Sequence, residues 1–168
     1  MKLQPRDIAA YARKPDPMSA GCLIFGDDAM RVALRRQEML KSLLGPNAEG
    51  EMRLMRLAAA DLRSDPAALI DAIKAVGFFP GPRAVFIDGA TDALAPVLAA
   101  ALADWRPGDA QIIATAARLT AKSALRKLFE DHRSARAAAI YDDPPSRAEI
   151  EALLREGGLH DLPRAAMD

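Results

Sequence analysis

Two aspartates after an apolar run mark the first place in this sequence where phosphate chemistry could occur. The run Gly21–Gly26 reads GCLIFG and continues into Asp27 and Asp28. A phosphate-binding P-loop needs spaced glycines, a lysine for the phosphates and a hydroxyl for Mg²⁺. This turn has one glycine, no lysine and no hydroxyl, and its carboxylates would repel phosphate. We therefore expect an aspartate here to cap the following helix.

Asp88 is the second candidate for nucleotide chemistry. It ends the apolar run AVFID and resembles the acidic residue that holds Mg²⁺ in P-loop NTPases. A hydrolysing site would normally place a second acid next, to orient water, whereas Gly89 follows here. A turn former or helix cap is the favoured interpretation of Asp88.

Residues that usually bind metals or act as nucleophiles are sparse. The single cysteine, Cys22, lies within an apolar run, which predicts a buried thiol and fits a reducing cytoplasm. His132 and His160 are the only histidines, and neither has a cysteine or acid at ligand spacing. Ser123 has no histidine partner suggested by spacing. We expect no catalytic residue, no metal site and no cofactor.

Three basic residues, Arg118, Lys122 and Arg126, recur at intervals of four. A helix beginning near Thr120 would place Lys122 and Arg126 on one face, which could contact a phosphate backbone or another subunit. A solvated helix face is the favoured interpretation. The chain carries 23 Lys and Arg against 23 Asp and Glu, so it lacks the basic charge of a dedicated nucleic-acid binder.

The stretch VGFFPGPRAV contains adjacent phenylalanines, Phe78 and Phe79. Gly77 and Pro80 should end a helix here, which places the pair on a turn before a buried strand. Burying one phenylalanine side chain is worth roughly 1.5–3 kcal/mol, so two exposed ones would call for a partner. Spacing alone leaves core packing and a partner site equally open.

The elements that must position these residues follow from the apolar patterns. Strands are expected at 21–26, 51–57, 84–88, 110–116 and 137–141, with helices between them. This alternation predicts an α/β fold with a parallel five-stranded sheet and helices on both faces. Two helical stripes are expected: Met30, Leu34, Leu40, Leu43 and Leu44 in one helix, and Leu69, Ile70, Ile73 and Val76 in another. Caps are expected at Ser64 or Asp65 and at Thr91.

The segment DDPP, which begins at residue 142, looks like a domain boundary. A capping box from Ser146 to Glu149 would start a further helix that stops at Gly157 and Gly158. A length of 168 residues suits one domain over 1–142 and a second, incomplete unit over 143–168. No apolar run approaches the roughly 18 residues of a membrane span, and the polar start lacks a signal peptide, so a cytoplasmic location is expected.

The order of these motifs resembles the delta subunit of bacterial DNA polymerase III, the clamp-loader wrench. In that family an apolar pair, a small turn residue and a basic residue precede a strand that ends in Asp. Phe78 and Phe79 match the pair, and Arg83 matches the basic residue. The stretches CLIFGDDAM, QIIATAARLTAKSALRKLFE and DDPPSRAEIEALLRE also resemble family segments. Phenylalanine at the first position of the pair and the Pro-Gly-Pro turn depart from the pattern.

The resemblance implies an AAA+, P-loop-NTPase-like domain over 1–142 whose degenerate nucleotide site neither binds nor hydrolyses ATP, followed by the start of a helical lid domain over 143–168. It implies a non-catalytic protein that binds the sliding clamp (beta) and favours ring opening, so that the clamp can be loaded on primed DNA. The clamp-binding residues would be Phe78, Phe79, Pro80, Gly81 and Arg83. The gamma or tau and delta prime subunits would be partners through a collar that this sequence lacks.

Two other functions remain open. One is an active P-loop-type ATPase or kinase, which the missing Gly-Lys-Ser/Thr opposes. The other is a DNA-binding module that uses Arg118, Lys122 and Arg126, which the neutral overall charge opposes.

Overall fold

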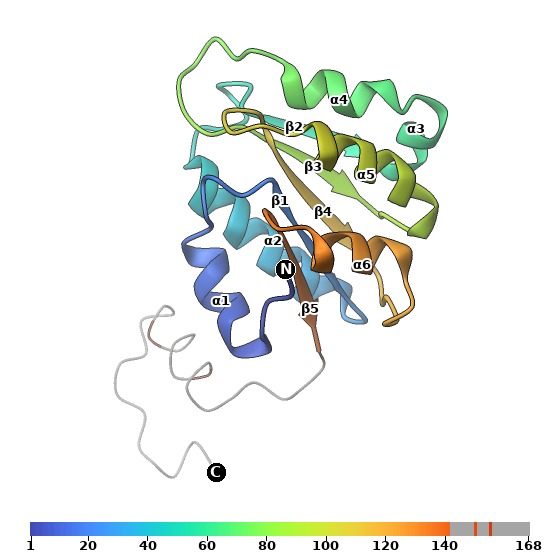
Figure 1. Cartoon of the computed structure of the whole chain (residues 1–168). Helices are drawn as coiled ribbons and strands as arrows, with labels where there is room; N and C mark the ends of the chain where they lie inside the picture. The colour runs from blue at the N-terminus through green and yellow to red at the C-terminus, as the bar shows by residue number, and fades with distance from the viewer. Residues whose placement is uncertain (142–149, 151–154, 156–168) are drawn as a thin grey trace.

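A computed structural model describes residues 1–141, 150 and 155, and its centre is a five-stranded parallel sheet (Figure 1). The strands are β1 (Gly21–Gly26), β2 (Leu54–Ala58), β3 (Ala84–Asp88), β4 (Gln111–Ala116) and β5 (Ala135–Ile140). The helices are α1 (Pro5–Arg13), α2 (Ala29–Leu44), α3 (Ala59–Ser64), α4 (Ala67–Lys74), the short 3-10 helix η1 (Asp92–Leu94), α5 (Ala95–Asp104) and α6 (Ala124–Asp131). The predicted α/β class and parallel sheet are confirmed.

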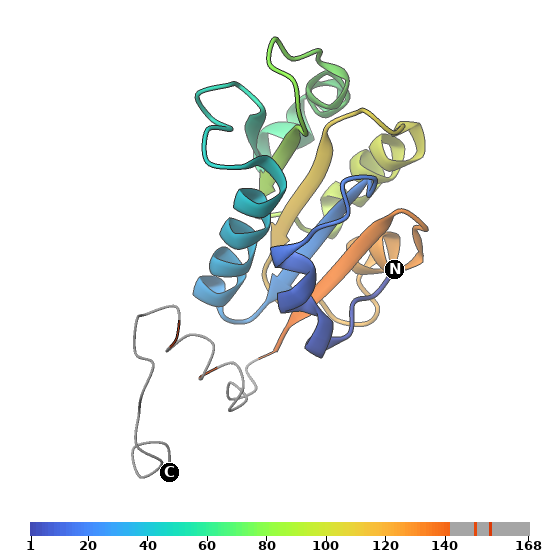
Figure 2. The same cartoon turned by 90° about the vertical axis from the view of Figure 1, so that its left-hand side faces the viewer.

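The strand order is β2-β3-β4-β1-β5, so β4 lies between β1 and β3. The register pairs Cys22 with Ile113 and Val85 with Ile112, and all the ladders are parallel. Helices cover both faces, as Figure 2 shows for α2 on one side and α5 and α6 on the other. This arrangement is consistent with a Rossmann-like or P-loop-like fold.

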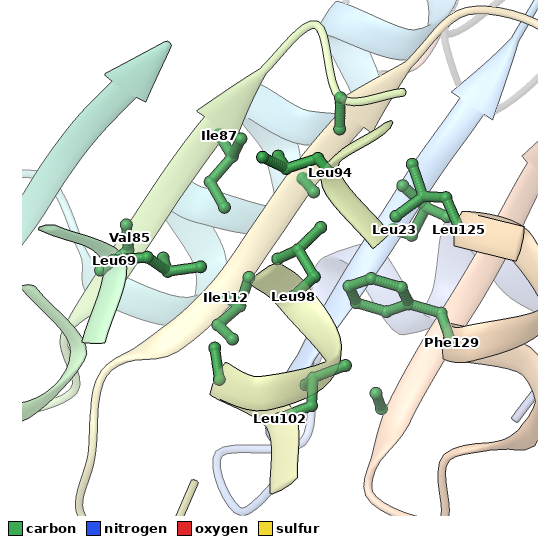
Figure 3. Packing of buried hydrophobic residues seen from close by; sticks show 14 of the residues in the cluster. Leu23, Leu69, Val85, Ile87, Leu94, Leu98, Leu102, Ile112, Leu125 and Phe129 are labelled. Atoms are coloured by element: carbon green, nitrogen blue, oxygen red, sulfur yellow. The ribbon is translucent and has the colours of Figure 1, made fainter. Parts of the chain in front are cut away.

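The larger core lies between the sheet and helices α3 to α6 (Figure 3). In α5 and the turn before it, Leu94, Leu98 and Leu102 recur every four residues, so one helical face enters the core. Alternate strand residues meet that face, including Val85 and Ile87 of β3. β1, β3 and β4 contribute side chains to this core and to a second one on the opposite face, as their apolar runs predicted.

The smaller core lies on the opposite face, under α1 and α2. Cys22 and Phe86 of the sheet pack there against Val32 and Met39 of α2. Burial raises the pKa of the Cys22 thiol to about 12, so it stays protonated and behaves as a small apolar side chain. The prediction of a buried thiol is confirmed.

The predicted stripe of α2 is wrong at its first half. Met30 and Leu34 are 73% and 60% exposed, whereas Val32 and Met39 are buried. Two residues along a helix turn the side chain by about 200°, so a face that contains Val32 excludes Met30. Arg36 continues the buried face, and its guanidinium lies 4.8 Å from the ring centre of Phe86.

The end of α4 also differs from its prediction. The helix ends at Lys74 and Ala75 is extended, so Val76 is 93% exposed instead of joining the stripe with Leu69 and Ile73. Pro66 stands at the N-cap, and neither Ser64 nor Asp65 caps the helix with its side chain. The prediction also missed α3, and the edge strand β2 begins at Leu54 instead of residue 51.

Thr91 occupies a helix N-cap, but its hydroxyl makes no capping hydrogen bond, because the chain first forms η1 and only then α5. The predicted boundary at 142–145, the capping box, the second unit over 143–168 and His160 lie outside the described residues, apart from Ile150 and Arg155. Within the described part of the chain, no helix combines the length and the apolar composition that crossing a membrane requires.

Candidate functional site

Residues 75–83, which connect α4 to β3, expose several large apolar side chains to solvent. We call this segment the diphenylalanine loop. Val76 is 93% exposed, Phe78 is 92% exposed and Phe79 is 45% exposed. Figure 1 shows the loop in light green, reaching out beyond the end of the sheet where β3 begins. The prediction that the pair lies on a turn before a buried strand is confirmed, and neither ring belongs to the core.

Hydrogen bonds hold the α4 end of the diphenylalanine loop. The Lys74 ammonium donates to the Asp104 carbonyl at 2.9 Å and to Asp109 Oδ2 at 2.7 Å. Its hydrogen bond to the Asp109 carboxylate raises the pKa of Lys74, so this contact keeps its charge across the neutral range. The last turn of α4 is therefore tied to the segment between α5 and β4.

Arg83 holds the β3 end of the loop. Its Nη2 donates to the Gly108 carbonyl at 3.1 Å, and its backbone carbonyl accepts from the Gln111 N–H at 2.8 Å. Its side chain also passes beneath Gly77, where a Cβ atom would lie 3.2 Å from Arg83 Cδ. Arg83 is therefore half-buried and packs against the loop at Gly77.

Arg53, just before β2, is a further cation at this loop, and sequence reasoning missed it. It is only 8% exposed, pairs with Glu51 at 2.6 Å, and donates from Nη1 to the Pro82 carbonyl at 3.1 Å. No strand pattern could have revealed the pair, because Glu51 and Arg53 lie in a turn before β2, with Met52 at a φ of 52° between them.

The opposite end of the sheet holds the residues that were considered for phosphate chemistry. Asp28 caps α2, because its carboxylate accepts hydrogen bonds from the backbone N–H groups of Met30 at 2.9 Å and Arg31 at 3.1 Å. Asp88 accepts a 2.9 Å hydrogen bond from the Thr115 hydroxyl. The capping prediction is thus confirmed for Asp28, and Asp88 serves a contact between β3 and β4.

A crevice of about 190 Å³ lies at this end of β1, β3 and β4. In doubly wound sheets, ligands bind where connections leave neighbouring strands toward opposite faces, as they do here after β1 and β4. Asp27, Asp88 and Thr115 line the crevice, and its one lining cation is Arg36. Among its described lining residues there is no lysine to hold a phosphate, so the chemistry of a P-loop is missing.

The three predicted basic residues do not form a face. Helix α6 begins at Ala124, so Arg118 and Lys122 precede it and only Arg126 lies on it. The expectation that Lys122 and Arg126 share one helix face is wrong, because Ser123 caps the helix later than the spacing suggested.

Arg118 and Arg126 both line a crevice of about 380 Å³ beside β1 and β5. Arg126 pairs with Glu130 at 2.8 Å, and its guanidinium lies 5.3 Å from the ring centre of Phe25. Arg118 lies 3.6 Å from the Asp27 carboxylate. Each cation therefore has a carboxylate beside it, which weakens its attraction for a phosphate backbone.

Ser123 and His132 have structural partners. The Ser123 hydroxyl and the Leu125 N–H both donate hydrogen bonds to the Asp92 carboxylate. These bonds, above all the one from Ser123, lower the pKa of Asp92. His132 Nδ1 accepts from the Ser134 N–H at 3.2 Å. In the described residues, no group of three or more His, Cys, Asp or Glu side chains could hold a metal ion.

No protein-family model matches this sequence, and no curated protein sequence matches it.

Proposed function

We propose that this chain acts as a delta-type clamp-loader subunit, and that the diphenylalanine loop binds the sliding clamp. Phe78 and Phe79 insert into an apolar pocket of the clamp, Pro80 and Gly81 shape the turn beneath them, and Arg83 supports that turn. The observation that carries the proposal is the exposure of both adjacent rings, 92% and 45%, on a loop held at both ends.

The composition of the loop favours tight binding by a small contact. Aromatic side chains in fully desolvated pockets are the most frequent hot spots of protein interfaces. Pro80 and Pro82 fix two backbone φ angles, which reduces the entropy that the loop loses on binding. An exposed apolar cluster of this kind is a liability in water unless a partner covers it.

The AAA+ assignment is part of the proposal. The crevice at β1, β3 and β4 stands where a P-loop protein holds nucleotide, and Asp27, Asp88 and Thr115 occupy it without a lysine. A non-catalytic subunit with a degenerate nucleotide site would have this composition. ATP bound by other loader subunits would then control when the loop reaches the clamp.

Binding alone can favour an open ring. A ligand shifts a conformational equilibrium by the difference in its affinity for the two states. If Phe78 and Phe79 enter a pocket that is better formed when the clamp interface is strained, their binding energy promotes opening, and the clamp can be loaded on primed DNA. The loop therefore performs the step without hydrolysing nucleotide itself.

Titration of the full chain with the sliding clamp of the same organism tests the proposal. We expect a 1:1 complex with the clamp protomer that Phe78→Ala plus Phe79→Ala weakens at least about 30-fold. One hot-spot truncation of roughly 2 kcal/mol accounts for this lower bound, because the losses of neighbouring hot spots are not additive.

The matched control for this titration is Met30→Ala plus Leu34→Ala. It removes two exposed apolar side chains from α2, which are 73% and 60% exposed and lie on a different element. We expect it to leave the affinity unchanged. Equal affinities for wild type and the double phenylalanine variant would overturn the proposal, and so would equal losses in both double variants.

A further inference from the structure

Arg53 is a buried charge at the base of an exposed apolar loop. The residue is 8% exposed and lies before β2, in the segment next to the diphenylalanine loop. Burying a guanidinium away from water is costly unless carboxylate and carbonyl groups replace the lost hydration. A charge in this position therefore has to be explained by the contacts that it makes.

The contacts of Arg53 connect two loops. Its Nε and Nη2 approach the same Glu51 carboxylate oxygen, at 2.7 and 2.6 Å, and its Nη1 donates to the Pro82 carbonyl at 3.1 Å. Its backbone carbonyl accepts from the Ala84 N–H at 2.9 Å, the residue that opens β3. One end of the guanidinium is thus fixed by Glu51, and the other end holds the diphenylalanine loop.

The loop passes closely over this guanidinium at Gly81. Gly81 has a φ of 119°, which side-chain-bearing residues rarely adopt. A Cβ atom there would lie 3.5 Å from Arg53 Nη1. Gly81 and Pro82 lie where the chain turns from Phe79 toward β3. Because Arg53 lies against Gly81 and holds the Pro82 carbonyl, it fixes the direction of that turn.

We infer that Arg53, oriented by Glu51, is the positioning residue of the diphenylalanine loop: it holds the Pro82 carbonyl and thereby sets the direction in which Phe78 and Phe79 project. Its effect on clamp binding rests on the proposed function, whereas its effect on the loop does not. A planar guanidinium holds its donors at a fixed spacing, so it can bond to Glu51 and to the Pro82 carbonyl in one rigid arrangement. Methionine has no donor, and the single ammonium of lysine lacks this spacing.

The chain offers a closely matched control in Arg56. Arg56 lies in β2, is exposed, and pairs at 2.6 Å with Glu49 in the segment before that strand. Its guanidinium lies 5.7 Å from the ring centre of Phe86, which belongs to the core. Arg56→Met removes a charge and an ion pair a few residues away from Arg53 and leaves Arg53 and Pro82 in place.

Fluorine NMR of the full chain labelled with 4-fluorophenylalanine reads the loop and the core together. The sequence has five phenylalanines, and Phe25, Phe86 and Phe129 are at most 3% exposed. Phe→Leu variants assign the signals. In Arg53→Met we expect both loop signals to narrow and the signal of Phe79, whose ring is 45% exposed, to move toward its unfolded-chain position, while the three core signals stay. Arg56→Met should move the Phe86 signal alone.

A role that is only structural would give a different spectrum, because a general loosening of the fold would move the core signals as well. Unchanged Phe78 and Phe79 signals in Arg53→Met would overturn the inference. If Arg53→Met does not fold, Arg53→Lys is measured in its place. Lysine keeps the charge but lacks the fixed donor spacing with which the guanidinium reaches both Glu51 and Pro82, so the Phe79 signal should still move.

The second arm measures affinity for the sliding clamp. We expect Arg53→Met to weaken binding about 10-fold, as for a lost hydrogen bond to a charged group, and Arg56→Met to leave it unchanged. If wild type does not bind the clamp, the proposed function fails while the NMR result still decides the role of Arg53. If wild type binds and Arg53→Met binds equally well, Arg53 does not position the binding residues.

Discussion

At the scale of single residues, exposure divides the phenylalanines into two groups with different roles. Phe25, Phe86 and Phe129 are at most 3% exposed, and each belongs to one of the two hydrophobic cores. Phe78 and Phe79 instead project from a loop whose ends are held by charged side chains. The contrast supports a binding role, because a buried ring stabilises the fold whereas an exposed one contributes energy only when a partner covers it.

His132 gives the molecule a dependence on pH. Burial lowers the pKa of His132, and the nearby Arg133 acts in the same direction. Its Nδ1 accepts the Ser134 N–H, a contact that protonation of Nδ1 would break. The unfolded chain therefore binds a proton more readily, and the contribution of neutral His132 is lost as the pH falls below the usual histidine pKa of about 6.5.

We expect the free energy of unfolding of wild type to fall more between pH 7.5 and 5.5 than that of His132→Asn, whose Oδ1 can accept the same N–H. Urea unfolding at several pH values measures the difference, and ordinary carboxylates stay ionised throughout that range. Parallel pH profiles for the two proteins would refute the role given to His132.

Single residues show where the sequence was informative and where it was not. Gly77 and Pro80 predicted that the phenylalanine pair lies on a turn, because both disfavour helix. Whether the rings were buried depended on how far the loop stands from the sheet, which spacing does not encode. Arg53 was missed for a related reason: its burial follows from contacts with Pro82, 29 residues away in the chain.

At the scale of elements, α6 shows how a capped helix start is built from two segments. The Ser123 hydroxyl accepts from the Arg126 N–H at 3.1 Å and bonds to the Asp92 carboxylate. Asp92 in turn accepts from the Leu125 N–H at 3.0 Å. The start of α6 is therefore tied to η1, and the helix cannot extend back to Lys122.

We expect Ser123→Ala to lower the free energy of unfolding by about 1–2 kcal/mol, because both the cap and a buried hydrogen bond are lost. Without the hydroxyl the pKa of Asp92 should rise toward its ordinary value, so the variant should lose less stability than wild type as the pH falls below about 4. Urea unfolding measures both effects. Lys122→Ala, an exposed neighbour before the cap, should change stability little, and an equal loss in both variants would contradict the capping role.

Strands were easier to predict than helix ends. β1, β3 and β4 are buried on both faces, so each reads as a continuous apolar run with few alternatives. The end of α4 was misplaced because Val76 continues the apolar spacing of Leu69 and Ile73. Periodicity gives the face of a helix and does not give its last residue, which here is Lys74, bonded to Asp109.

At the scale of the whole molecule, the two ends of the parallel sheet carry different chemistry. The diphenylalanine loop leads into the amino end of β3, while the crevice with Asp27, Asp88 and Thr115 lies at the carboxyl ends of the strands. The proposed clamp contact at one end uses none of the side chains that line the crevice at the other. The sequence predicted the chemistry of each end separately. The loop was recognised from its apolar turn, and the crevice from the lysine that a P-loop would need and that is missing here.

The composition of the carboxyl-end crevice makes a last prediction, on nucleotide binding. A bound triphosphate would place several negative charges beside the Asp27 and Asp88 carboxylates, and Arg36 is the one cation lining the crevice. That guanidinium already lies over the Phe86 ring, and its Nε atom is buried without a hydrogen-bond partner in the described residues. We expect no saturable heat when ATP and Mg²⁺ are titrated into the chain up to about 1 mM.

The variant Asp27→Asn plus Asp88→Asn removes the repulsion but supplies no lysine, so it should also give no saturable heat. Saturable binding by wild type would instead favour an active P-loop-type ATPase or kinase, and binding by the variant alone would show that the two carboxylates, more than the missing lysine, exclude the nucleotide.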